Sequence, residues 1–465
     1  MYAKPTESEL TLHFETAILD PTCGCKGIIM SRSILKCLSC EASYPIEENI
    51  YTCPACNGLL DVVHDLSEWH GKGEELRQLF DARLMSWSPP DRSGVWRYRE
   101  LVGPGTAEAD IVSRGEGNTT LYNATSDLAL YTGVNRLQLK HEGENPTGSF
   151  KDRGMATGVT RARQIGASSV ICASTGNTSA SMSSFAALAG MQALILFPEG
   201  KVALGKVAQS LAYGAVSVQV RGDFDEALEL VRQAAESLPV YMLNSINPFR
   251  LEGQKSIIIE LLHQRGWQVP DWIVVPGGNL GNSAAFGKAL LEMQEVGLLD
   301  RLPHVAVIQA TGAAPFANAF VKEFEEFEPV TAETVATAIR IGNPASFAKA
   351  VRTVVKTDGW ATAVSDQEIM DAKAKIDAAG IGCEPASAAT VAGVRSLVES
   401  GVIDAEDEVV CVLTGHVLKD PQVVIDYHSK AMQKVDPSFA NEIHTIYGTL
   451  DELVEFLPGN AAVRL

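Results

Sequence analysis

Short apolar runs alternate with longer amphipathic segments along most of the chain, from about residue 135 to residue 420. Short apolar runs between turn signals predict buried strands, whereas longer segments with an apolar residue every three or four positions predict helices. The predicted strands are Arg136–Lys140, Ser169–Ala173, Leu194–Phe197, Val216–Val220, Tyr241–Leu243, Trp272–Val275, Val305–Ala310 and Val409–Leu413. The predicted helices are Thr178–Ala189, Leu204–Leu211, Asp225–Ser237, Leu251–Arg265 and Ser283–Val296. Strands and helices in this order form βαβ units, so the sequence predicts an α/β fold with doubly wound parallel sheets.

Composition divides the chain into three parts. Residues 1–66 show little helical pattern and are rich in cysteine, proline and turn residues, which predicts a small N-terminal module. Residues 67–430 contain the alternating pattern and are predicted to form the main domain, with a smaller subdomain at roughly 153–245. Residues 431–465 are predicted to form a C-terminal tail that carries no recognisable chemistry.

The 465-residue chain has an ordinary globular composition, with 46% hydrophobic and 20% charged residues. Its 57 acidic and 38 basic side chains give a formal net charge of −19, which argues against binding nucleic acid or an anionic membrane through overall charge. No apolar run approaches the ~20 residues that span a bilayer. The polar start, with Lys4, Glu7 and Glu9, does not resemble a secretory signal. We therefore predict a cytoplasmic protein with no nucleic-acid or membrane partner.

Six of the nine cysteines lie before residue 60, and an odd number in so large a chain argues against a secreted disulfide framework. Two CxxC pairs, separated by twelve residues, have the spacing of a zinc ribbon, in which four thiolates bind Zn²⁺ tetrahedrally. The predicted metal ligands are Cys37, Cys40, Cys53 and Cys56. The alternatives are a ribbon that folds without metal and four ordinary thiols. Glu41 and Asn57 stand where such turns often have glycine, and Cys23 and Cys25 are spaced too closely for a usual metal turn.

A loop rich in glycine and proline, residues 141–150, follows a predicted strand and leads into a helix predicted to begin near Ser149. Lys151 therefore lies in the first helical turn, where the positive helix end lowers the pKa of a lysine amine. A neutral amine is what Schiff-base chemistry requires. The alternative is a surface lysine paired with Asp152 or Glu144, and on Lys151 alone that explanation is the better one.

The sequence of this loop, Asn145–Arg153 (NPTGSFKDR), resembles the lysine loop of the threonine synthases, which belong to the tryptophan-synthase-β-like superfamily of pyridoxal-phosphate (PLP) enzymes. The resemblance covers essentially residues 35–425, including the cysteine-rich module. It implies two doubly wound parallel-sheet subdomains with PLP between them, beside the small N-terminal ribbon. It also implies a covalent bond between PLP and Lys151, and a homodimer.

Two further loops resemble cofactor-binding segments of the same family. In Ser174–Ser179, the resemblance places Asn177 against the phenolic oxygen of PLP. It also implies that the substrate carboxylate is bound by Ser174, Thr175 and Thr178. Plain helix capping by Ser or Thr is the alternative for this loop. In Pro276–Asn282, the cradle for the PLP phosphate would consist of Gly277, Gly278, Asn279, Leu280 and Gly281. A glycine-rich loop also suits a dinucleotide, but that ligand leaves Lys151 unexplained.

Two segments after predicted strands complete the resemblance. In threonine synthases an Asn-Ser pair and a following Arg hold the phosphate of O-phospho-L-homoserine, which implies substrate-binding roles for Asn244, Ser245 and Arg250. Pairing of Arg250 with Glu252 or with a surface carboxylate is the alternative. Thr414 is implied as the partner of the PLP ring nitrogen, with Val417 where the family motif usually has glycine. Residues 382–387 also match a segment near the cofactor, and no chemical step is assigned to Glu384.

The resemblance implies a PLP-dependent lyase that converts O-phospho-L-homoserine and water to L-threonine and phosphate. Lys151 is the implied catalytic residue, because its released amine can move protons near one face of the cofactor. One alternative is another PLP-dependent lyase or β-replacement enzyme that acts on threonine or an O-phospho amino acid. An alternative from a different class is a non-catalytic metal-binding protein whose ribbon captures a partner.

Overall fold

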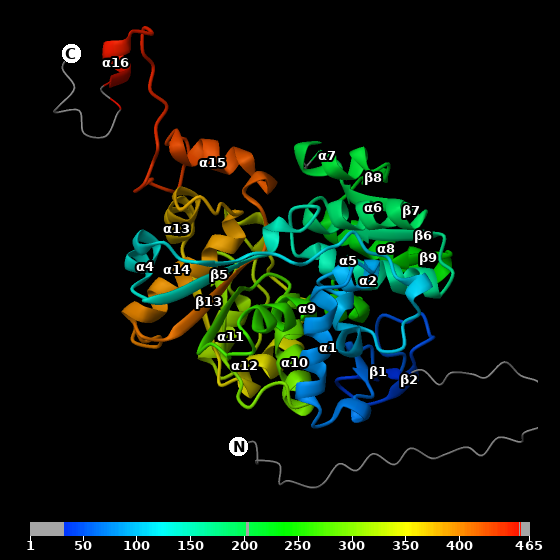
Figure 1. Ribbon diagram of the computed structural model, residues 1–465. Coiled ribbons are helices and arrows are strands. Elements are labelled where there is room, and N and C mark those ends of the chain that lie inside the picture. Colours follow the sequence, from blue (N-terminus) through cyan, green and yellow to red (C-terminus); the bar gives the residue numbers. More distant parts are fainter. Residues whose placement is uncertain (1–31, 201–203, 455, 457–465) are drawn as a thin grey trace, which may run out of the picture. The chain divides into compact units, whose positions relative to one another are not determined.

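The computed structural model describes residues 32–200, 204–454 and 456, and these residues form three β-sheets with surrounding helices (Figure 1). Two of the sheets are built mainly from parallel strands, and the third is a small antiparallel sheet near the N-terminus. The α/β fold class predicted from the alternating pattern is therefore confirmed. Cys23 and Cys25 lie outside the described residues.

The larger sheet has six strands in the order β12-β11-β10-β13-β5-β4. Its strands are β4 Leu121–Asn123, β5 Arg136–His141, β10 Trp272–Pro276, β11 His304–Ala310, β12 Trp360–Val364 and β13 Glu408–Leu413. Neighbouring strands are parallel, except that β4 runs antiparallel to β5 at one edge.

Helices cover both faces of this sheet. One face packs on α9 (Pro248–Gln264), α10 (Gly281–Glu295), α11 (Pro315–Val321) and α12 (Phe347–Lys356), and the other on α4 (Ser126–Thr132), α13 (Asp366–Ala378) and α14 (Pro385–Glu399). Successive side chains of a strand point to opposite faces, so Ile273 and Val275 enter the first core while Trp272 and Val274 enter the second. Burial on both faces explains why these strands read as continuous apolar runs.

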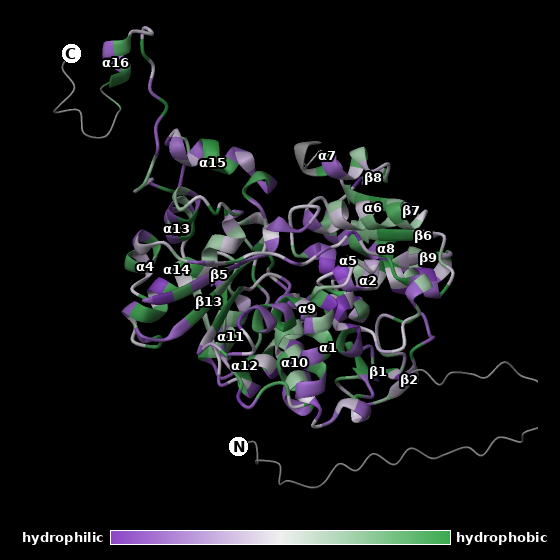
Figure 2. Ribbon diagram, viewed as in Figure 1, coloured by the Kyte–Doolittle hydropathy of each residue, from purple (hydrophilic) through white to green (hydrophobic). Residues whose placement is uncertain are grey.

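The smaller sheet has four parallel strands in the order β8-β7-β6-β9. These strands are β6 Ser169–Ala173, β7 Gln192–Pro198, β8 Val216–Val220 and β9 Val240–Met242. Helices α5 (Lys151–Gln164), α6 (Asn177–Ala189) and α7 (Leu204–Ala212) share one hydrophobic core with β6, and α8 (Phe224–Ser237) packs on the opposite face. The core that holds α5 and α6 also contains α9 and α10, so the two parallel sheets share one continuous interior. Strands β6 and β13 are coloured mainly hydrophobic in Figure 2, as expected for buried strands.

The antiparallel sheet, in the order β2-β1-β3, consists of β1 Ser33–Cys37, β2 Ser43–Pro45 and β3 Leu60–His64. A buried ion pair and a buried hydrogen bond join it to helices α12 and α9. Asp61 of β3 lies 2.9 Å from Lys349 of α12, and His64 Nε2 lies 2.8 Å from Glu252 Oε2 of α9. Glu252 also pairs with Lys255 at 2.6 Å and with Lys288 of α10. Because buried charges are stable only when they are paired, β3 and these helices depend on one another.

The remaining helices connect and border these layers. They are α1 Gly73–Leu84, α2 Pro89–Arg92, α3 Arg99–Val102, α15 Pro421–His428 and α16 Leu450–Val454, and the short 3-10 helices η1 Ser67–Trp69, η2 Trp96–Tyr98, η3 Glu108–Asp110, η4 Glu142–Glu144, η5 Thr337–Ile339 and η6 Val417–Lys419. Among the described residues, no helix has the length and apolar character needed to cross a bilayer. The predicted boundaries at residues 66, 153, 245 and 430 stay a prediction.

Candidate active site

Three of the loops that carry candidate residues leave neighbouring strands at one edge of the larger sheet. Strands β10, β13 and β5 are adjacent and parallel, and each is followed by one of these loops. The loops are the glycine-rich loop after Pro276, the Thr414 loop, and the loop that leads to Lys151. The carboxyl edge of a parallel sheet is where α/β proteins bind ligands. The fourth and fifth loops leave the adjacent strands β6 and β9 of the smaller sheet.

Lys151 begins α5, as the sequence predicts, and it is half-buried, so that a small molecule can still reach it. Burial lowers the pKa of its amine to about 7, and the charge of Arg250 lowers it further while Glu384 opposes the shift. The main cause is therefore loss of water, which the sequence argument from the helix end did not identify. Nζ lies 4.2 Å from the centre of the Phe150 ring.

The expected alternative partners of Lys151 are engaged elsewhere. Asp152 accepts hydrogen bonds from the amide and hydroxyl of Thr147, at 2.7 and 2.6 Å. Glu144 accepts from the Thr120 amide at 2.8 Å and from the Tyr122 hydroxyl at 2.6 Å. Within the part of the chain that the structure describes, Lys151 forms no ion pair. A half-buried lysine with a lowered pKa and no carboxylate partner is suited to act as a nucleophile.

Backbone hydrogen bonds hold the Lys151 loop against the Thr414 loop. The Phe150 amide donates to the Thr414 carbonyl, and the His416 amide donates to the Gly148 carbonyl, both at 3.0 Å. The Glu384 amide donates to the Gly415 carbonyl, also at 3.0 Å. Three separate segments of the chain therefore form one continuous wall beside Lys151.

Side-chain hydrogen bonds within this wall join two residues with predicted cofactor contacts. Asn177 Nδ2 donates to Glu384 Oε2 at 3.0 Å, and Thr414 Oγ1 lies 3.3 Å from Glu384 Oε1. Ser387 Oγ lies 3.2 Å from Thr414 Oγ1 and accepts from the Gly415 amide at 3.0 Å. Asn177 and Thr414 thus share Glu384, a residue to which the sequence argument assigned no step.

The Ser174–Thr178 loop follows β6 and leads into α6, and its residues are half-buried. The residue that caps α6 is Gly176, and no side chain caps the helix. The Ser174 hydroxyl accepts from the Gly176 amide at 3.3 Å, inside the loop. The alternative of plain helix capping by Ser or Thr is therefore wrong for α6. The predicted contacts of Ser174, Thr175 and Thr178 with a substrate carboxylate stay a prediction.

The glycine-rich loop after β10 packs so closely on neighbouring segments that two of its positions leave no space for a side chain. A Cβ on Gly277 would lie 2.7 Å from Val307, and a Cβ on Gly278 would lie 3.0 Å from the Ala338 carbonyl. Leu280 caps α10 with a positive φ of 62°, a strained conformation for a side chain of this size. No side chain caps α10, so the free N–H groups at its start can bind an anion.

Asn279, in the same loop, is used to position a neighbouring segment. Its side-chain oxygen accepts from the Ala345 amide at 3.3 Å, and its carbonyl accepts from the Ser346 amide at 3.1 Å. The side chain therefore anchors the start of α12, and the contact between the loop backbone and a phosphate stays a prediction.

Arg250, in the first turn of α9, is 2% exposed and its Nη1 donates to the Leu243 carbonyl at 3.2 Å. Burial lowers the pKa of its guanidinium to about 10. Among the described residues Arg250 forms no ion pair, so the expected alternatives of Glu252 and a surface carboxylate are both wrong. A buried guanidinium without a counter-ion is costly unless an anionic ligand completes it.

Asn244 and Ser245 lie just before Arg250 in the same loop after β9. The Asn244 side chain clamps the end of β6, accepting from the Ala173 amide and donating to the Ala173 carbonyl, both at 3.1 Å. Asn244 therefore fixes the loop that carries Asn177. The predicted contacts of Asn244 and Ser245 with a phosphate stay a prediction.

Several polar atoms near these loops are buried without a hydrogen-bond partner among the described residues. They are Arg250 Nε, Gln254 Oε1, Asn282 Oδ1 and Ser149 Oγ. Gln254 Oε1 lies 3.3 Å from the position of a Cβ on Gly281, which connects α9 with the glycine-rich loop. Native proteins leave few such atoms unsatisfied, so their gathering around one site indicates a missing polar ligand. Gln254, Asn282 and Ser149 were not predicted, although all lie in or beside the segments singled out from the sequence.

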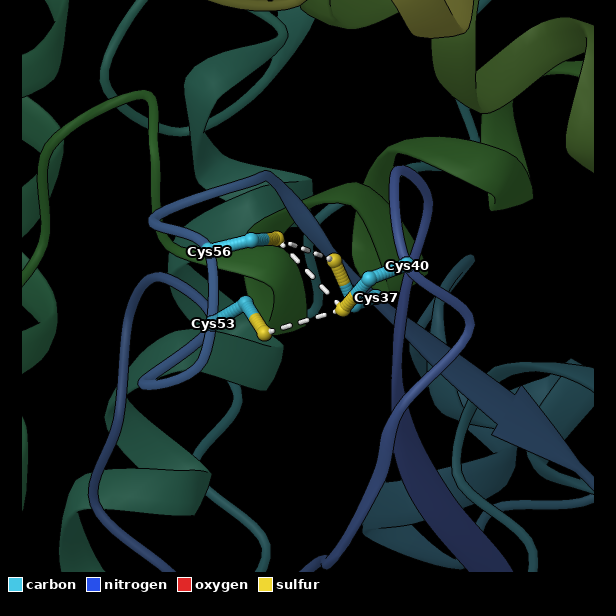
Figure 3. A group of neighbouring side chains, drawn as sticks. All are labelled: Cys37, Cys40, Cys53 and Cys56. Atoms are coloured by element: carbon cyan, nitrogen blue, oxygen red, sulfur yellow. Dashed lines mark hydrogen bonds between the residues drawn. The ribbon is translucent and has the colours of Figure 1, made fainter.

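The four predicted metal ligands converge at the ends of the N-terminal ribbon (Figure 3). Their Sγ atoms all lie within 4.8 Å of one another, with three separations of 3.4, 3.5 and 3.6 Å. Zinc–sulfur bonds of about 2.3 Å in a tetrahedron give sulfur–sulfur edges of about 3.8 Å. Glu41 and Asn57, which follow the two CxxC pairs, have positive φ values of 59° and 58°. Both turns therefore adopt the glycine-like conformation of a metal turn despite their side chains, and the donor set fits zinc.

Comparisons with known proteins agree with this site. The family described as "Pyridoxal-phosphate dependent enzyme" matches residues 112–415. Threonine synthase from Methanocaldococcus jannaschii is 47% identical over 84% of this chain and 94% of its own length. Threonine synthase 2, chloroplastic, from Arabidopsis thaliana is 39% identical over 91% of this chain and 84% of its own length. The crystal structure of Escherichia coli threonine synthase shares the fold, with a TM-score of 0.64 and 19% identity over 84% of this chain and 90% of that one. The chain therefore belongs to the family of pyridoxal-phosphate-dependent enzymes and groups there with the threonine synthases.

Proposed function

We propose that this protein is a threonine synthase, which converts O-phospho-L-homoserine and water to L-threonine and phosphate in a PLP-dependent reaction. The observation that carries the proposal is Arg250, a buried guanidinium without a counter-ion whose charge acts on Lys151. A phosphorylated substrate supplies the missing anion, and a guanidinium stabilises a departing phosphate. The 47% identity to a threonine synthase supports the same substrate.

The residues around Lys151 fit PLP. Lys151 offers an amine with a lowered pKa, the glycine-rich loop offers backbone amides at the start of α10, and Asn177 and Thr414 are joined through Glu384. When bound, PLP withdraws electrons from the substrate carbon that loses its proton. Lys151 would hold the cofactor, and its released amine would carry protons between neighbouring carbon atoms.

Different loops would hold the two ends of the substrate. The hydroxyls of Ser174, Thr175 and Thr178 are proposed to bind the carboxylate, and Arg250, Asn244 and Ser245 the phosphate. Arg250 lies in the first turn of α9, so the phosphate would also meet the positive end of a 17-residue helix. With both ends held, the substrate carbon atoms would stay beside Lys151.

One assay tests this proposal against the related PLP enzymes. Purified protein is incubated with PLP and O-phospho-L-homoserine, and both L-threonine and inorganic phosphate are measured. Equal amounts of the two products support a threonine synthase. Release of ammonia from threonine, with no phosphate from phosphohomoserine, would instead identify a PLP-dependent lyase of the alternative kind. A protein that binds no PLP would point to the non-catalytic alternative.

The lowered pKa of Lys151 predicts how PLP capture depends on pH. The amine reacts only when it has lost its proton, and its pKa is shifted down from 10.5 to about 7. The rate at which PLP-free protein captures PLP should therefore rise as the pH increases towards 7 and level off above it. Stopped-flow absorbance between pH 5.5 and about 9 measures this. A rate that keeps rising to pH 10 would show an ordinary lysine amine.

The ribbon is proposed to bind one Zn²⁺ through Cys37, Cys40, Cys53 and Cys56, in a closed structural site. Replacing Cys40 with serine should reduce the zinc content from about one ion per chain to about none, since structural zinc requires four ligands. It should also lower the thermal midpoint, because metal binding contributes to folding. Elemental analysis and thermal unfolding measure the two effects. The control is Cys411→Ala, a buried cysteine of β13 outside the cluster, which should keep the metal; equal zinc content in C40S and the control would contradict the proposed site.

The family resemblance also leads us to propose a homodimer located in the cytoplasm. Sedimentation of the purified PLP-bound protein measures its oligomeric state. A mass of one chain at micromolar concentration would contradict the homodimer.

A further inference from the structure

Glu384 forms a buried bridge between two residues with proposed cofactor contacts. One carboxyl oxygen accepts from Asn177 Nδ2 at 3.0 Å, and the other lies 3.3 Å from Thr414 Oγ1. The residue is only 4% exposed. Gly415 packs against it so closely that a Cβ there would lie 2.3 Å from the carboxyl carbon. Solvent therefore does not compete for either oxygen.

No cation neutralises this carboxyl at close range. Among the described residues Glu384 forms no ion pair, and the charged groups that face it are Lys151 of α5 and Lys419 of η6. Lys419 donates to the Thr147 carbonyl at 2.9 Å and to Gln209, and burial lowers its pKa. The adjacent Cys383 thiol is buried, and burial raises its pKa, so it stays neutral.

Burial also raises the pKa of Glu384, and hydrogen bonds from Asn177 and Thr414 oppose that shift only in part. A buried carboxyl group without a counter-ion at close range is more stable as the neutral acid than as an anion. Its burial and the absence of an ion pair therefore favour a protonated Glu384.

The position of that proton follows from its neighbours. An amide nitrogen only donates, so Oε2 accepts from Asn177, and a proton on Oε1 is the arrangement that leaves Oε2 its full capacity as an acceptor. Oε1 then donates to Thr414 Oγ1. Ser387 Oγ already accepts from the Gly415 amide, so its own hydrogen is available to Thr414 as well. With two hydrogen bonds accepted, the hydroxyl proton of Thr414 has to point away from Glu384 and Ser387.

We propose that Glu384 is a positioning residue: as a neutral acid it turns the hydroxyl proton of Thr414 toward the ring nitrogen of PLP, which is then hydrogen-bonded but unprotonated. The inference rests on the proposed function and on the expected place of Thr414. In PLP the phenolic oxygen and the ring nitrogen lie along one edge of the ring, so one carboxyl can serve both Asn177 and Thr414. An unprotonated ring nitrogen withdraws electrons less strongly, which limits side reactions of the substrate.

The test is the ¹⁵N NMR signal of protein loaded with ring-¹⁵N-labelled PLP, at neutral pH. The wild type should give the signal of a hydrogen-bonded neutral pyridine nitrogen. Glu384→Gln should leave it unchanged, because the glutamine oxygen faces Asn177 and its NH₂ donates to Thr414 as the acid does. Glu384→Met, which offers no donor, should shift the signal toward that of a pyridine without a hydrogen bond, as should Thr414→Val. In the T414V protein, E384M should add no further shift.

Raising the pH provides a second measurement that needs no apolar variant. Ionisation of Glu384 in the wild type reverses the Thr414 hydroxyl and should move the ¹⁵N signal, whereas the signal of E384Q should stay fixed. A pyridinium signal in the wild type at neutral pH would overturn the proposal, as would a shift in E384Q at neutral pH. Identical pH behaviour of the two proteins would overturn it too. Failure of the wild type to bind PLP would instead count against the proposed function.

Discussion

Replacing Lys151 with alanine is expected to abolish both the visible absorbance of the PLP-bound protein and the formation of threonine. The variant lacks the half-buried amine that lies beside Arg250 and Glu384, so it can neither hold the cofactor covalently nor move protons at the substrate. A positioned proton-transferring side chain contributes about 10²–10⁴-fold to a rate, and the loss should be at least of this size. Absorbance spectra and a coupled phosphate assay measure the two effects.

The matched control for this experiment is Lys356→Ala. Lys356 lies at the exposed end of α12, and its replacement should leave absorbance and turnover unchanged. Circular dichroism of both variants checks that the fold is intact. Retention of the absorbance band and of turnover in K151A would remove the basis of the proposed chemistry.

Replacing Arg250 with methionine is expected to lower the activity without lowering the stability of the protein. Removing one partner of a buried charge pair costs about 2–5 kcal/mol, and each 1.4 kcal/mol is a factor of ten. We therefore expect kcat/KM for O-phospho-L-homoserine to fall at least about 30-fold. The PLP-free protein should lose no stability, because Arg250 is buried without a counter-ion and methionine fills similar space. Steady-state kinetics and thermal unfolding measure the two quantities.

Arg161→Met provides the opposite pattern as a control. Arg161 is also buried, but it donates to the Ile46 carbonyl at 2.6 Å and lies over the Phe249 ring, in contact with the ribbon. R161M should therefore lower the thermal midpoint and leave KM unchanged. Equal losses of kcat/KM in R161M and R250M would show that Arg250 supports the structure rather than the substrate.

Much of the parallel sheets could be predicted from the sequence, because most of their strands are buried on both faces; β8, at an edge of the smaller sheet, is largely exposed. The structure has β6 and β8 with the predicted ends, Ser169–Ala173 and Val216–Val220. Strand β12, Trp360–Val364, was not predicted. It lies at the edge of the larger sheet and contains two alanines and a threonine, so its apolar signal is weak. Strand β4, Leu121–Asn123, is an edge strand of three residues and is too short to show an alternation of apolar and polar residues.

The ends of helices are a second feature that the sequence predicts poorly. Helix α9 was predicted from Leu251, whereas it begins at Pro248 after the capping side chain of Asn247, which accepts from the Phe249 amide at 3.0 Å. Proline in the first turn of a helix was interpreted as part of the preceding loop. The earlier start places Arg250 inside the helix and fixes its direction.

For the site, the loops could be predicted but the contacts between them could not. Each loop follows a strand, and the carboxyl ends of neighbouring parallel strands meet at one edge. The role of Glu384 depends instead on Asn177, which is 207 residues away in the chain, and on Thr414, which is 30 residues away. No local pattern reports such a contact. The cause of the lowered Lys151 pKa was missed for the same reason, because burial and the charge of Arg250 come from packing.

The buried polar contacts of β3 have a consequence for how the protein unfolds. Asp61 of the cysteine-bearing sheet forms an ion pair with Lys349 of α12, and His64, whose pKa is lowered by burial, forms a hydrogen bond with Glu252 of α9, the helix that carries Arg250. Separating the sheet from these helices would break the buried ion pair, at a cost of about 3–5 kcal/mol, and the hydrogen bond as well. The described residues from Arg32 onward belong to one compact unit. The cysteine-bearing sheet and helices α9 and α12 should accordingly melt in a single cooperative step, without a partly folded species that keeps one and loses the other.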